Sequence, residues 1–189
     1  MSLQSNSEQY ADIRRHGEVS MHGVGTDEPQ SAVTFPAVED EDAATQSAAR
    51  LLITAPTPRG VETLARRIHG AGLRAELPFV HTWACDLSIG AEALRQQCSG
   101  FLDAAAGGSM LISNVEEMPP IVQDVLLELL AGLELVRRPS AAVRLISGTT
   151  VSLVDRVTAG TFSDRLFYRL NIIHLMAGDH PNGKPTPMR

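Results

Sequence analysis

A phosphate-binding site is the first chemistry that the sequence suggests, in the stretch from Leu51 to Gly70. The stretch reads LLITAPTPRGVETLARRIHG and predicts a buried strand, a short loop and a helix. A phosphate-binding loop at such a junction has the pattern G-x-x-x-x-G-K-[ST], in which backbone N–H groups and the lysine hold the phosphates. The segment from Ala55 to Glu62 instead has prolines where glycines belong, and it contains no lysine.

The other residues with catalytic or metal-binding potential do not form a set. Cys85 and Cys98 have no metal-ligand spacing around them, so we expect reduced packing cysteines. His69, His81 and His174 are isolated in the sequence and have no i, i+4 pair or acidic partner that suggests a ligand set. No serine-hydrolase signature such as G-x-S-x-G occurs. We therefore predict no metal site and no disulfide.

Composition narrows the class of protein. The chain has 189 residues, 43% of them hydrophobic but only 4% aromatic, which fits one α/β domain with an aliphatic core. The formal net charge of −6 argues against a broad nucleic-acid-binding face, because such a face needs clustered Lys and Arg. No apolar run approaches the about 18 residues of a membrane span, and the polar start has no signal-peptide core. We expect a cytoplasmic protein without membrane contact.

Apolar runs alternate with helical spacing along the middle of the chain. This order implies parallel βαβ units with right-handed crossovers. Strands are predicted at residues 50–54, 78–82, 109–112, 143–147 and 172–175, and helices at 61–70, 91–105, 120–132, 151–159 and 163–170. Residues 133–137 are predicted to form a short extended arm.

Both ends of the chain are predicted to be flexible. Residues 1–45 are polar and include the acidic run at 39–42, which is typical of a flexible acidic tail, with one short helical turn at residues 10–15 as the exception. Residues 46–178 form the predicted domain. Residues 179–189 are predicted to be a flexible C-terminal tail without an element of its own.

Several segments of the sequence resemble the AAA+ domain of sigma-54-dependent transcriptional activators. They are LLITAPTPRGVETLARRIHG, PFVHTWACDL, AAAGGSMLISNVEEMPPIVQDVLLELL, VRLISGTT and TAGTFSDRLFYRLNIIHL, and they span roughly residues 50–176, about two thirds of the chain. The resemblance implies a three-layer α/β/α fold like that of P-loop NTPases, with a mainly parallel five-stranded sheet in the order 5-1-4-3-2. It also implies that this chain lacks the helical lid and the C-terminal helix-turn-helix of many relatives.

The resemblance identifies the phosphate loop as a degenerate one. It places Val61 where the lysine belongs and Glu62 in the last position, where the family commonly has glutamate. The prolines in the loop have no N–H, and Gly60 is its remaining glycine. Two interpretations stay open. The loop is an ordinary strand-to-helix turn capped by Thr57, or Arg59 and the helix N-terminus retain affinity for an anion.

The metal and water site of the family falls on neutral residues. Family members end the third strand with adjacent acidic residues that hold Mg²⁺ and orient the attacking water. The resemblance places Ser113 and Asn114 at these two positions. Glu116 and Glu117 follow in the turn beyond the strand, where we expect them to act as helix N-terminal charges before Pro119.

Further family positions have changed as well. The sensor asparagine falls at Thr150, and an asparagine of the second strand falls at Trp83. The first intersubunit arginine falls at Ser163, while the second is retained as Arg169. Arg165 is nearby but occupies an acidic position, so the intersubunit candidates are the two arginines of this predicted helix.

These changes together predict a function without ATP hydrolysis. The segment between PFVHTWACDL and GGSMLI is also too short for the G-A-F-T-G-A loop that contacts sigma-54 in the family. We therefore expect no enzyme and no cofactor, but a catalytically inactive AAA+-like domain that regulates transcription by binding protein, such as an active sigma-54-dependent activator, without direct DNA or sigma-54 contact. Two alternatives are a domain that still binds ATP or ADP without hydrolysis, and a structural part of a regulator whose acidic tail recognises the partner.

Overall fold

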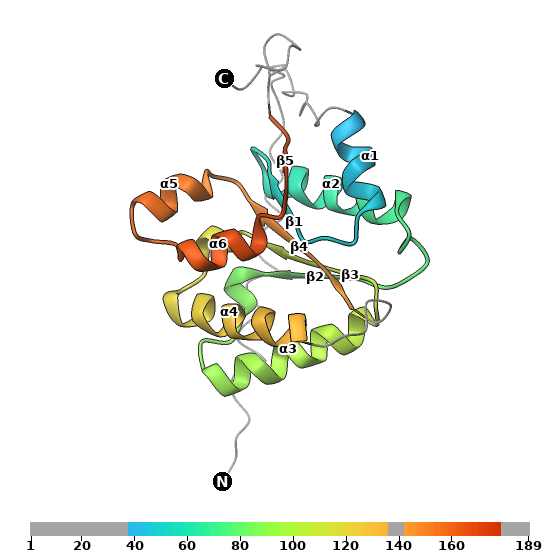
Figure 1. Ribbon diagram of the computed structural model, residues 1–189. Helices are drawn as coiled ribbons and strands as arrows, with labels where there is room; N and C mark the ends of the chain where they lie inside the picture. Colours follow the sequence, from blue (N-terminus) through green and yellow to red (C-terminus); the bar gives the residue numbers. More distant parts are fainter. Residues whose placement is uncertain (1–37, 136–141, 179–189) are drawn as a thin grey trace, which may run out of the picture. The chain divides into compact units, whose positions relative to one another are not determined.

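A single sheet of parallel strands organises the chain, whose structure is a computed structural model that describes residues 38–135 and 142–178. The strand order is β2-β3-β4-β1-β5, and every pairing is parallel, which confirms the predicted order (Figure 1). The strands are β1 Leu51–Thr54, β2 Phe79–Trp83, β3 Ser109–Ser113, β4 Arg144–Thr149 and β5 Ile173–Met176.

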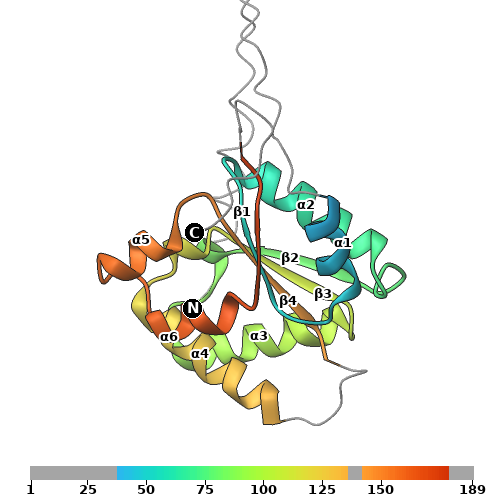
Figure 2. The ribbon, with the colours of Figure 1, turned by 45° about the horizontal axis from the view of Figure 1, so that its top comes forward.

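Helices cover both faces of this sheet and give the three predicted layers. In Figures 1 and 2, α1 and α2 lie on one face, and α3, α4, α5 and α6 lie on the other. The α-helices are α1 Val38–Gln46, α2 Pro58–Ala71, α3 Ala91–Ala105, α4 Pro120–Leu135, α5 Leu153–Thr158 and α6 Asp164–Leu170. Two short 3₁₀ helices, η1 Ala84–Asp86 and η2 Val115–Glu117, follow β2 and β3.

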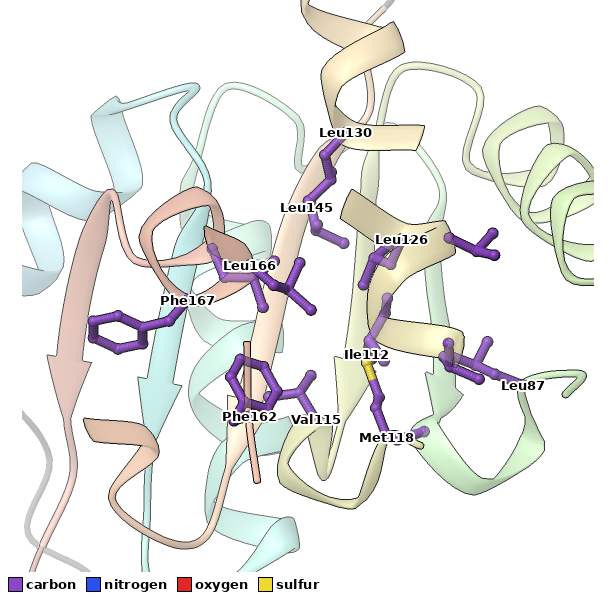
Figure 3. Packing of buried hydrophobic residues seen from close by; sticks show 14 of the residues in the cluster. Leu87, Ile112, Val115, Met118, Leu126, Leu130, Leu145, Phe162, Leu166 and Phe167 are labelled. Carbon is purple, nitrogen blue, oxygen red and sulfur yellow. The ribbon is translucent and has the colours of Figure 1, made fainter. Parts of the chain in front are cut away.

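Each strand of the centre is buried on both sides, as its continuous apolar sequence predicts. In β1, Leu51 and Ile53 pack toward α2, while Leu52 packs into the core on the other face. That second core is aliphatic with a few aromatic rings, and Figure 3 shows how α4, α6, η2 and the central strands fill it. Its labelled members are Leu87, Ile112, Val115, Met118, Leu126, Leu130, Leu145, Phe162, Leu166 and Phe167.

The helix after β1 begins three residues earlier than its apolar spacing predicts. It starts at Pro58, because proline has its φ already set for a first helical turn and has no N–H to leave unsatisfied there. Its buried face carries the predicted residues Val61, Leu64, Ala65 and Ile68. The helix N-terminus therefore lies inside the segment that would form a phosphate-binding loop.

The prediction that residues 1–45 form a flexible tail is wrong for its last part. Val38–Gln46 is helical, and Ala44 is fully buried against the α2 face of the sheet. The buried guanidinium of Arg144 donates from Nη2 to the Ala44 carbonyl at 2.7 Å and from Nε to the Ala49 carbonyl at 3.0 Å. Because these contacts are non-local, the weak apolar periodicity of the segment could not reveal them. The predicted turn at residues 10–15 and the C-terminal tail at 179–189 lie outside the described residues.

The predicted extended arm at residues 133–137 is also wrong where it is described, since α4 continues to Leu135. Residues 136 and 137 lie outside the described part. Within residues 38–135 and 142–178, no helix is both long and apolar enough to cross a membrane.

Candidate functional site

The residues predicted for a nucleotide site gather at the carboxyl ends of β1, β3 and β4. This edge is where parallel α/β sheets bind their ligands, because the loops that follow the strands meet there. It is formed by the turn after Thr54, by Ser113 and Asn114 at the end of β3, and by Thr150 directly after β4.

The loop after β1 is a capped turn, as one of the two interpretations predicted. Thr57 has an extended backbone, and its Oγ1 accepts a hydrogen bond from the Gly60 N–H at 3.1 Å. The N–H of Val61 donates to the Thr57 carbonyl at 3.1 Å, which closes the first helical turn. Both N–H groups are thus engaged by Thr57 and do not point at a ligand.

Few N–H groups of the loop are left to surround a phosphate. The N–H of Ala55 donates to the Thr149 carbonyl of β4 at 3.1 Å, and Pro56 has none. Gly60 and Val61 donate to Thr57, and Pro58 has no N–H. Of residues 55–61, this leaves the N–H groups of Thr57 and Arg59, for which the described part of the chain shows no acceptor. The side chain of Arg59 is exposed at the start of the helix.

The position predicted for the lysine faces the core. Val61 is 1% exposed and belongs to the cluster that α2 forms with β1, β3 and β4. Its Cγ1 atom lies 2.2 Å from the place where a Cβ atom on Gly148 would stand, so helix and strand meet at this pair. A side chain at position 61 therefore enters the protein interior and does not reach out over the loop.

A chain of polar contacts connects the start of α2 to the ends of β2 and β3. Glu62 Oε1 accepts from Arg66 Nε at 2.8 Å and lies 3.7 Å from His81 Nδ1. On the other side of the ring, His81 Nε2 lies 2.9 Å from Ser113 Oγ. The prediction that His81 has no acidic partner is wrong, because Glu62 is 19 residues away in sequence and only the fold brings it close. The ring also contacts Trp83 in a tilted arrangement, with centroids 5.1 Å apart.

Hydrogen bonding and burial shift the pKa values of Glu62 and His81 in this chain of contacts. The hydrogen bond from Arg66 lowers the pKa of Glu62, so this carboxylate is ionised at neutral pH. Burial lowers the pKa of His81, and the nearby Glu62 charge offsets part of this effect. Ser113 is fully buried, so its hydroxyl is not accessible to attack a substrate. The Glu62–His81–Ser113 contacts thus form an internal polar network rather than a catalytic triad.

The Glu116 carboxylate, expected to act as an N-terminal charge of the next helix, instead contacts Thr150, the position of the family's sensor asparagine. Glu116 Oε1 accepts from the Thr150 N–H at 2.9 Å and from its Oγ1 at 2.8 Å. Glu117 Oε1 likewise accepts from Asn114 Nδ2 at 3.0 Å. These three bonds correct the expected role, because η2 turns the chain back over the edge of the sheet. The signal available in the sequence was the acidic pair three residues beyond Ser113.

Two buried oxygens at this edge lack a hydrogen-bond partner within the described residues. They are Asn114 Oδ1 and Glu116 Oε2. Asn114 adopts a left-handed backbone with φ 57° and ψ 45°, a conformation that asparagine tolerates better than most residues. Within residues 38–135 and 142–178, no group of three His, Cys, Asp or Glu side chains could hold a metal ion. This edge therefore presents buried oxygens of Asn114 and Glu116 beside the neutral hydroxyl of Ser113.

The two candidate intersubunit arginines lie on α6, on the other face of the sheet from α2. Leu166, Phe167 and Leu170 point into the core as predicted, which leaves Arg165 exposed and Arg169 half-buried. Helix α6 packs mainly against α4, α5 and β4, whereas the loop after β1 leads into α2 on the opposite face of the sheet. Ser163, at the first arginine position of the family, is the N-cap of α6, and its Oγ accepts from the Leu166 N–H at 3.3 Å.

Comparisons with known proteins point to one family. Residues 88–176 match the family described as the sigma-54 interaction domain. The regulatory protein AtoC of Escherichia coli is 33% identical over 151 residues, which cover 69% of this chain and 32% of AtoC. The nitrogen assimilation regulatory protein NtrX of Azorhizobium caulinodans is 32% identical over 139 residues, covering 66% of this chain and 31% of NtrX. The chain thus spans about a third of the length of these relatives.

Solved structures agree with this result. NtrX from Brucella abortus in complex with ATP superposes with a TM-score of 0.61 at 26% identity, covering 89% of this chain and 40% of that one. The P-loop NTPase domain of a sigma-54 activator from Escherichia coli has a TM-score of 0.52 at 22% identity, and it covers 69% of this chain and 97% of its own. The second likeness supports the fold alone, and it confirms the predicted P-loop NTPase-like architecture.

Proposed function

Because this domain belongs to the sigma-54 interaction domain family, we propose that it is a catalytically inactive AAA+-like module that regulates transcription by binding protein. The observation that carries the proposal is the burial of Val61 against Gly148. A lysine that reaches the β- and γ-phosphates is central to a phosphate-binding loop, and here that position faces the core.

The polar residues at the other catalytic positions support the same proposal. Ser113 is buried and bonded to His81, and Thr150 is bonded to Glu116. Hydrolysis in this type of site requires acidic groups that hold Mg²⁺ and a residue that orients water. Ser113 and Thr150 are therefore engaged in other contacts, and the neutral side chain of Asn114 supplies no charge to hold Mg²⁺.

The proposed partner is an active sigma-54-dependent AAA+ activator. AAA+ subunits meet with the arginine region of one against the nucleotide edge of the next, and α6 presents Arg165 and Arg169. Through these arginines, the domain would contact a subunit that holds ATP and so tune its activity. The proposal includes no direct contact with DNA or sigma-54, and it places the protein in the cytoplasm.

The proposal is tested first by ATP turnover and then by titration against such an activator. We expect turnover at background level, and we expect Arg169→Ala to weaken partner binding by roughly 1–3 kcal/mol if the contact is desolvated. Arg156→Ala is the matched control, since this arginine is exposed on the neighbouring α5. Turnover above background would refute the inactive site, and unchanged binding by Arg169→Ala would refute the α6 contact.

Residual binding of ATP or ADP without hydrolysis is the second candidate function. The similar NtrX structures from Brucella abortus contain ATP in one case and ADP in the other. Here the N-terminus of α2 and the exposed Arg59 would supply the attraction for phosphate. Calorimetric titration with each nucleotide distinguishes the two candidates: binding that Arg59→Ala weakens supports the second, and no heat of binding supports the first.

A further inference from the structure

The outer edge of β5 carries backbone groups that no other described strand uses. Strand β5 lies at the end of the sheet and pairs only with β1 among the described strands. The N–H of Ile173 donates to Arg50 at 3.2 Å and the N–H of Ala177 to Thr54 at 2.8 Å, so the odd-numbered residues face β1. Because backbone direction alternates along a strand, His174 and Met176 direct their N–H and C=O groups to the open edge.

The side chains along this edge are apolar and exposed. Ile172 is 54% exposed and Met176 is 66% exposed, and they flank His174. The sequence IHLM of β5 contains no charge and no proline, which are the residues that normally keep edge strands from pairing with other chains. An edge of this composition has the properties of a strand-pairing surface.

Strand β2, at the opposite edge of the sheet, does not have exposed apolar side chains of this kind. None of the five side chains of β2 is exposed to the same degree, since each is buried or half-buried. The guanidinium of Arg66 covers the ring of Phe79 at 4.7 Å from its centroid, and Pro78 precedes the strand. The exposed apolar edge is thus a particular property of β5 and not of both sheet ends.

We propose that β5 pairs antiparallel with β5 of a second copy of this chain, about a two-fold axis beside His174. The two exposed apolar residues are equally far from His174, so this axis places Ile172 opposite Met176 of the second copy at both ends of the ladder. One self-complementary contact then covers both side chains, as a two-fold interface requires. The absence of charge on β5 means that like strands meet without repulsion.

A cavity beside the edge agrees with such a partner. It has a volume of about 180 Å³ and a mainly apolar lining, and His174 and Met176 of β5 form part of its wall with Val154 of α5. A strand added to β5 lies along this wall, so it also covers apolar surface of the cavity rim. The chain's own last residues are a poor alternative, because the three prolines at positions 181, 185 and 187 disfavour a strand.

The first test is the concentration dependence of the sedimentation of the 189-residue chain. We expect a reversible dimer that dissociates on dilution, because a short ladder buries less surface than a stable interface. Met176→Lys should weaken the dimer at least tenfold, since it places a lysine opposite Ile172 twice. Ile89→Lys changes an apolar residue of similar exposure, 69%, between η1 and α3 at the other end of the sheet, and it should leave the dimer intact.

The second test reports the register. In a Cys85→Ser background, which removes the exposed native thiol, His174→Cys should form a disulfide-linked dimer on mild oxidation. Residues opposite each other at such a position have Cα atoms about 5.5 Å apart, within the range that a disulfide spans. Ile172→Cys alone should not cross-link, but a mixture of Ile172→Cys and Met176→Cys chains should. A monomer at all concentrations, a dimer that Met176→Lys leaves unchanged, or cross-linking by Ile172→Cys alone would overturn the proposal.

Discussion

Val61 of α2 occupies the space above Gly148 of β4, with its Cγ1 only 2.2 Å from the position of a Cβ atom there. The glycine is the reason that the helix can pack so closely on the sheet at this point. Because the resemblance places the same valine at the lysine position of the family motif, close packing of α2 and the proposed loss of the phosphate contact share one structural origin.

Replacing this glycine should destabilise the domain. Gly148→Ala forces the methyl group into Val61, and we expect a loss of roughly 1–3 kcal/mol in the free energy of unfolding. Adding Val61→Ala should restore part of this loss, so that the two changes couple by about 1 kcal/mol in a double-mutant cycle measured by urea unfolding. Strict additivity of the two changes would show that the side chains do not compete for this space.

Restoring the lysine should not restore hydrolysis. Val61→Lys introduces a charge at a position that is 1% exposed, and we expect it to cost roughly 2–4 kcal/mol of stability. Thr63→Lys is the control, because this residue is exposed on the same helix. Unfolding curves and ATP turnover are measured for both variants. A stable Val61→Lys protein with ATPase activity would contradict the placement of the site.

Acidification should weaken the fold near pH 6. Burial lowers the pKa of His69 and of His81 below the ordinary value of 6.5, so the folded protein binds fewer protons than the unfolded chain as the pH falls. Stability is therefore complete above about pH 6.5 and is progressively lost below it. Urea unfolding at pH 7.5 and at pH 5.5 measures the effect.

Removing a buried histidine should reduce this pH dependence. In His69→Gln the slope of stability with pH becomes smaller, although the protein also loses the contacts of the ring with Ser109 Oγ at 3.0 Å and the Leu77 carbonyl at 3.1 Å. The change in slope, not the change in stability, reports the titration. Equal stability at both pH values for the unmodified chain would exclude the mechanism.

The helix α1 should depend on Arg144. Arg144→Met removes two charged hydrogen bonds to the carbonyls of Ala44 and Ala49, and we expect a loss of about 2–4 kcal/mol and faster amide exchange in α1. Burial lowers the pKa of this guanidinium to about 10, so it remains charged at neutral pH. Arg67→Ala, which removes a more exposed contact with Glu41, should cost less than about 1 kcal/mol. Unchanged exchange in Arg144→Met would mean that other contacts hold the helix.

The sequence by itself determined the elements whose signals are local. Apolar runs between turn residues predicted the five strands, because a buried parallel strand needs continuous apolar side chains. The spacing of Val61, Leu64 and Ile68 predicted the buried face of α2, and Thr57 before Pro58 predicted its cap. The order of the strands followed from the resemblance to a family, since periodicity carries no information on which strands are neighbours.

Only the tertiary structure decided which polar residues meet at the edge of the sheet. Glu116 reaches Thr150 across 34 residues, and Glu62 reaches His81 from the helix opposite β2. These contacts depend on the direction in which η2 leads the chain and on the distance between α2 and the sheet. The spacing of apolar residues within a single helix or strand predicts neither of them. The helix α1 was missed for the same reason, because the hydrogen bond that holds it comes from Arg144, 100 residues farther along the chain.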